Sequence, residues 1–130
     1  MNRRATKKRK EEYLEFLKCH DGVEIFCYTN RKNFYEIIER EIIPSLDSSI
    51  KIVKLIGKEP STDLNEEMVS HMLFNIKNIG FPNAMKIVKG EVIDISMHKE
   101  LYDGINNGNI QNITELVQSK FAEIRHRGKN

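Results

Sequence analysis

The chain has little cysteine, little proline and no long apolar run, and each shortage argues against a class of proteins. It holds two cysteines and three prolines in 130 residues. Neither a Cys-x-x-Cys nor a His-x-x-x-His pair occurs, so we expect no metal site of the usual spacing. No run of about 18 apolar residues is present, which argues against a transmembrane helix. Nucleotide-binding glycine motifs and Gly-x-Ser-x-Gly are also missing, so we expect no cofactor and no membrane association.

What the chain does contain is unevenly charged. Residues 1–10 carry six Lys and Arg and no acid, whereas the other residues carry 15 Lys and Arg against 19 Asp and Glu. Glu11 and Glu12 follow where a secretory signal peptide would have its apolar core, so we expect a cytoplasmic protein with reduced cysteines. We interpret residues 1–10 as a flexible basic arm, 11–125 as one domain and 126–130 as a flexible tail. Such an arm would bind polyanions weakly and in a salt-dependent way.

Apolar spacing predicts alternating helices and strands. Phe34, Ile37, Ile38 and Ile42 fall on one helical stripe that Pro44 should end or kink. Short apolar runs at 23–28 and 50–56 predict buried strands. The other predicted elements are a helix from about 10 to 21, a helix from 63 to 76, strands at 83–88 and 91–95, a loop or short helix at 97–105, and a helix at 113–124. Frequent Asn, Lys and Ile are compatible with a bacterial source.

Two helix starts carry a capping signal, Asp63 with Glu66 and Asn112 with Glu115. A helix between the first two strands predicts that they pair in parallel. The tight turn at residues 89–90 predicts an antiparallel hairpin for the last two strands. Together these elements predict an α/β domain with a four-stranded mixed sheet and helices on both faces.

The order of these motifs resembles the thioredoxin superfamily. A strand leads into a loop and helix at 27–34, and a second parallel strand follows that helix. The stretch 74–82 is similar to the family's helix, linker and cis-proline, and 88–92 is similar to its hairpin turn. The resemblance covers roughly residues 20–125. It implies a thioredoxin-like three-layer α/β/α sandwich with an extra N-terminal helix and a cis peptide bond before Pro82.

The residues that carry the family's redox chemistry are missing. In this alignment Asn30 takes the tryptophan position, Arg31 and Phe34 take the two cysteine positions, and Ile25 replaces the buried carboxylate. Dithiol exchange needs a thiolate nucleophile and a second thiol that resolves the mixed disulfide. The resemblance therefore implies a redox-inactive member that is more plausibly a binding or adaptor module than an enzyme.

The resemblance also implies a groove beside Pro82 in which an extended peptide or a partner protein pairs with the backbone. Arg31 and Lys32 stand at the start of a predicted helix, which suggests an anion or acidic-peptide site, although a solvated loop is the simpler reading. The candidate binding residues flank this groove on both sides: Phe81, Pro82, Asn83, Asn30, Arg31, Lys32 and Phe34.

The alternative function is an atypical thiol-disulfide oxidoreductase or a glutathione-binding protein acting through one cysteine. Alternation along the first strand places Cys27 in a layer with Val23 and Ile25, where a buried thiol would be inert. Cys19 ends the first predicted helix and could be exposed. A disulfide between the two is not expected, and the four scattered histidines suggest no metal site.

Overall fold

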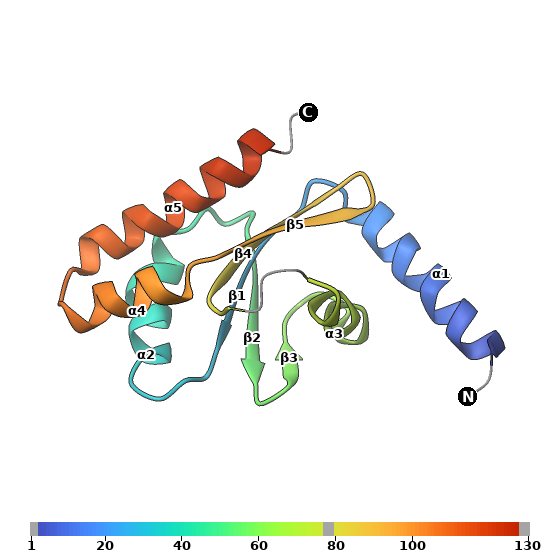
Figure 1. Ribbon diagram of the computed structural model, residues 1–130, viewed down its shortest axis with the longest axis horizontal. Coiled ribbons are helices and arrows are strands. Elements are labelled where there is room, and N and C mark those ends of the chain that lie inside the picture. The colour runs from blue at the N-terminus through green and yellow to red at the C-terminus, as the bar shows by residue number, and fades with distance from the viewer. Residues whose placement is uncertain (1–2, 77–79, 128–130) are drawn as a thin grey trace.

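The chain builds a mixed β-sheet with helices on both sides (Figure 1). The computed structural model describes residues 3–76 and 80–127. Parts of the predicted arm, tail and linker, at residues 1–2, 128–130 and 77–79, lie outside the described residues. No helix within the described ranges is long and apolar enough to span a bilayer. The elements are α1 (Arg3–Cys19), β1 (Glu24–Thr29), α2 (Tyr35–Ile37), η1 (Ile38–Ile42), η2 (Ile43–Ser45), β2 (Lys51–Ile56), β3 (Glu59–Ser61), α3 (Glu66–Phe74), β4 (Asn83–Val88), β5 (Glu91–Ser96), α4 (His98–Asn106) and α5 (Ile110–Arg127).

The sheet has the order β3-β2-β1-β4-β5, with β1 in the centre. β1 pairs in parallel with β2, and β4 pairs antiparallel with both β1 and β5. Lys89 and Gly90, which join β4 to β5, both have positive φ, at 51° and 78°. Positive φ at both central positions is typical of a type I′ turn, whose twist matches that of the flanking strands. The parallel pair and the hairpin agree with the sequence prediction.

The predicted count of four strands is wrong, because the described sheet has five. The additional strand, β3, pairs antiparallel with the end of β2, and Pro60 lies opposite Leu55. Gly57 has a φ of 65° and so permits the tight turn between the two strands. The sequence analysis predicted no strand between 50–56 and the helix from 63. Proline disfavours the interior of a sheet, but an edge strand tolerates a residue without an N–H donor.

Alternation along β1 divides the core into two layers, one on each face of the sheet. Phe26 and Tyr28 belong to a buried cluster with side chains of η1, α4 and α5. Ile25 and Cys27 belong to a second cluster with side chains of α1 and α3. Figure 1 shows the same division, with α2, α4 and α5 on one side of the sheet and α1 and α3 on the other.

Both predicted capping boxes are wrong. Asn65 caps α3, and its side-chain oxygen accepts a hydrogen bond from the Met68 N–H at 3.0 Å. Asn and Asp are about equally good N-cap residues, so Asn65 satisfies a free backbone N–H of α3 as effectively as Asp63 was expected to. The final helix already begins at Ile110, so Asn112 lies inside its first turn.

Two other helices differ from the prediction in extent or regularity. α1 starts at Arg3 rather than near Lys10, in keeping with the high helix propensity of Arg, Lys, Ala and Glu. The helix predicted up to Pro44 consists of the short α2, a π-helical segment η1 and a 3₁₀ turn η2 that contains this proline. Pro44 has no N–H to donate, and the change of helix type accommodates it within the turn.

Candidate functional site

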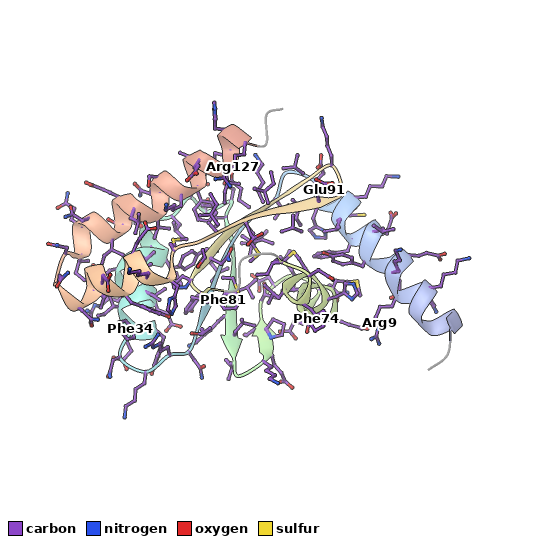
Figure 2. The ribbon with its side chains drawn as sticks, in the orientation of Figure 1. Arg9, Phe34, Phe74, Phe81, Glu91 and Arg127 are labelled. Carbon is purple, nitrogen blue, oxygen red and sulfur yellow. The ribbon has the colours of Figure 1, made fainter. Side chains whose placement is uncertain are left out.

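A cavity of about 430 Å³ lies where β1 ends, and we call it the Arg31–Phe81 groove. Its walls come from four parts of the chain that are far apart in sequence: the end of β1, the loop that follows it, the segment before β4, and α4. Figure 2 labels Phe81 at the start of β4 and Phe34 beside the loop before α2. The lining residues are Thr29, Arg31, Gly80, Phe81, His98 and Tyr102.

Arg31 lies against an aromatic surface on one side of the groove. Its guanidinium carbon is 4.6 Å from the ring centroid of Tyr102 and 5.0 Å from that of Phe34. The two rings are themselves 4.3 Å apart, and the His98 ring is 4.7 Å from Tyr102. Contacts of a cation with aromatic faces are worth about 0.5–1 kcal/mol at an exposed site, so they hold the guanidinium plane in one orientation.

Gly80 and Phe81, which precede β4, also line the groove. A Cβ at Gly80 would collide with the Ser96 side chain, so only glycine lets this segment lie so close to β5. The Asn83 side chain donates a hydrogen bond to the Gly80 carbonyl at 3.3 Å. Within the described part of the chain, neither the N–H nor the carbonyl of Phe81 forms a hydrogen bond. Phe81, a lining residue of the groove, therefore has a backbone donor and a backbone acceptor with no partner among the described residues.

Comparison of the chain with protein-family models, with curated proteins and with solved structures finds no match. The chain is an α/β protein with a five-stranded mixed sheet. The residues that line the groove are therefore the main evidence for its function.

The structure brings together some of the predicted site residues and separates others. Arg31 and Phe81 line the groove, and Phe34 contacts the Arg31 guanidinium. Pro82 and Asn83 are buried beneath it, and the Phe81–Pro82 peptide bond is cis.

Two predicted site residues lie outside the groove wall. Asn30 and Lys32 are exposed and are not among its lining residues. A helix start at Arg31 and Lys32 is wrong, because α2 begins only at Tyr35 and Asn33 has a positive φ of 75°. Arg31 and Lys32 therefore do not lie at a helix N-terminus, which was the basis of the predicted anion site.

Thr29, Gly80, His98 and Tyr102 line the groove but were not among the predicted site residues. The last two belong to α4, where the weak pattern at 97–105 predicted only a loop or short helix. They are one helical turn apart, and the Tyr102 side chain is 7% exposed. A spacing of i and i+4 in an aromatic pair was the available signal, but nothing in the sequence pointed to a contact with Arg31.

Neither cysteine reaches the groove. Cys27 is fully buried in β1, and desolvation by burial raises the pKa of its thiol well above the usual range. Cys19 is exposed at the end of α1, with its Sγ 3.6 Å from a Glu15 carboxylate oxygen. Both thiols are free. No group of three or more metal-ligating side chains occurs among the described residues.

A second, larger cavity of about 620 Å³ lies between α1 and α3. Its wall includes Cys19 and long charged side chains of α1. The wall also includes the rings of Phe16 and His20, whose centroids are 4.4 Å apart. The charged side chains have exposed positions on one helix, so ordering them around a ligand would cost side-chain entropy.

A polar triad joins η1 to β1 and β2. Glu39 accepts hydrogen bonds from the Tyr28 hydroxyl at 2.6 Å and from the Lys54 ammonium at 2.7 Å. The bond from Lys54, followed by the bond from Tyr28, lowers the pKa of the Glu39 carboxyl. Burial, followed by the same carboxylate, raises the pKa of Tyr28. The triad stabilises the segment that follows the Arg31 loop.

Proposed function

We propose that the chain is a redox-inactive thioredoxin-like protein that binds an extended peptide or a partner loop in the Arg31–Phe81 groove. The order of elements supports this proposal: a parallel β-helix-β unit, then a helix, then a hairpin preceded by Pro82. The first half supplies the loop that carries Arg31, and the second half supplies Phe81. Both meet at the end of the central strand.

The observation that carries the proposal is the Phe81 backbone, which forms no hydrogen bond to another described residue. An extended peptide that lies beside Phe81 would accept from its N–H and donate to its carbonyl, as an added strand does. Backbone pairing supplies affinity without sequence preference, whereas neighbouring side-chain pockets supply specificity. A cavity of about 430 Å³ is of the size that holds a small ligand or one side chain of a peptide.

The alternative of a single-cysteine enzyme has less support. Thiol chemistry needs a thiolate that a substrate can reach. Cys27 is fully buried with a raised pKa, and Cys19 lies on α1, away from the groove wall. The groove residues carry no thiol, so binding is the function that its geometry supports.

The test is affinity selection of displayed peptides that are randomised at every position, with the full chain immobilised. We expect peptides that bind the natural protein and lose binding to Arg31→Glu. Lys32→Glu is the matched control, because it changes the same charge at the next residue outside the groove wall. Pro82→Ala should also weaken binding. Because Pro82 is buried, its replacement also perturbs the core, so Thr29→Trp, which fills the groove from β1, provides a second check.

Circular dichroism should confirm that each variant keeps the fold. Enriched peptides that bind Thr29→Trp and Arg31→Glu as tightly as the natural protein would refute the proposal, because both changes alter residues that line the groove.

A further inference from the structure

Arg31 differs from the other arginines whose side chains the structure describes. Arg9, Arg40, Arg125 and Arg127 each form an ion pair with a carboxylate, as close as 2.7 Å for Arg125. Within the described part of the chain, no carboxylate forms an ion pair with Arg31. Its contacts are the two aromatic rings and the His98 ring nitrogen Nε2, which lies 3.5 Å from Nη1.

These contacts leave the hydrogen-bonding capacity of Arg31 almost unused. A guanidinium has five N–H donors in a planar fork, and a separation of 3.5 Å is at the outer limit of a hydrogen bond. Among the described residues, the His98 ring is the one hydrogen-bond partner of the Arg31 side chain, so most of its N–H donors are available to a ligand. A fixed fork of this kind matches the two oxygens of a carboxylate.

We infer that the groove recognises a carboxylate of the bound peptide through Arg31, an inference that rests on the proposed function. Charge favours a carboxylate over a dianion, because Arg31 is the one Lys or Arg among the groove-lining residues that the structure describes. A singly charged group would balance it. Tyr102 and Phe34 contact the guanidinium, and Phe81 lines the same groove. The ligand class is therefore an extended peptide that carries an Asp or Glu.

The experiment compares an enriched peptide with its Asp→Asn or Glu→Gln counterpart by fluorescence anisotropy. Hydrogen bonds to charged groups are stronger than neutral ones, although solvent at this exposed site reduces the gain. We expect the neutral peptide to bind the natural protein about tenfold more weakly. The difference should vanish in Arg31→Gln. Arg31→Glu should prefer a peptide in which Lys replaces the acid.

Equal affinity for the acidic and neutral peptides, with both still lost in Thr29→Trp, would overturn the carboxylate inference and leave peptide binding intact. A second probe serves if selection enriches no groove-binding peptide. Acetyl-aspartate amide is titrated into isotope-labelled protein while the Arg31 Nε–H resonance is followed, with acetyl-asparagine amide as control. A saturable shift with the aspartate probe alone supports the carboxylate site even if peptide binding fails. Identical responses to both probes would overturn it.

Discussion

Alkylation of Cys27 in the native protein should be slower than alkylation of Cys19 by at least about a thousandfold. Cys27 lies in the central strand, in register with Val53 on β2 and with Asn83 on β4. Its side chain lies in the buried layer between the sheet and the helices α1 and α3, so a reagent reaches the sulfur only after this layer of the core opens. Small domains unfold with at least about 5 kcal/mol, so the open fraction is roughly one in several thousand. The raised pKa of Cys27 slows the reaction further.

The assay is pulsed labelling with iodoacetamide at neutral pH, read by mass spectrometry of peptides that contain each cysteine. Exposed Cys19 serves as the internal reference. The Cys19→Ala variant isolates the reaction of Cys27, and labelling in denaturant should bring the two rates close together. If Cys27 reacts within tenfold of Cys19 in the native protein, then the reasoning from burial is wrong. The single-cysteine enzyme would then regain its nucleophile.

Two further predictions concern the scaffold. Gly104→Ala should lower the free energy of unfolding by about 1 kcal/mol in urea denaturation, because the new Cβ would lie 2.8 Å from Ile113 Cγ1. Overpacking costs about 1–3 kcal/mol and exceeds the gain of up to about 1 kcal/mol in helix propensity. Asp103→Ala, at an exposed position on α4, should change stability little. Glu39→Gln should remove a pH-dependent part of the free energy of unfolding. Because the pKa of Glu39 is lowered in the folded protein, its carboxylate stabilises the fold fully above the unfolded pKa of about 4.3. This contribution is lost as the pH falls through the folded pKa. An unchanged difference between natural protein and Glu39→Gln from pH 7 to pH 3 would contradict that assignment.

The core strands could be predicted because their signal is local. The apolar run at 23–28 identified β1, and alternation along it placed Cys27 in the layer that it occupies. The hairpin turn at Lys89 and Gly90 was readable for the same reason, since only a few backbone conformations close so short a connection. β3 was missed because Pro60 is a strong loop signal, whereas its position at a sheet edge is a property of the tertiary structure.

Only some of the residues that line the groove could be predicted from the sequence. Arg31 and Phe81 were selected through a resemblance in the order of elements. His98 and Tyr102 were not selected, because their role depends on how α4 packs beside the Arg31 loop. No periodicity reports that packing. Lys32 was selected for its charge, but its exposed position leaves it outside the groove wall. The sequence therefore indicated which segments lie near the groove, whereas tertiary contacts determine which residues line it.

Chemical-shift mapping with an enriched peptide tests directly whether the peptide binds in the Arg31–Phe81 groove. The full chain is isotope-labelled, its backbone resonances are assigned, and the peptide is added to saturation. If the peptide binds in this groove, the largest shifts should fall on Thr29, Arg31, Phe81 and His98. Shifts concentrated instead on the cavity between α1 and α3, around Glu15 and Cys19, would contradict the proposal.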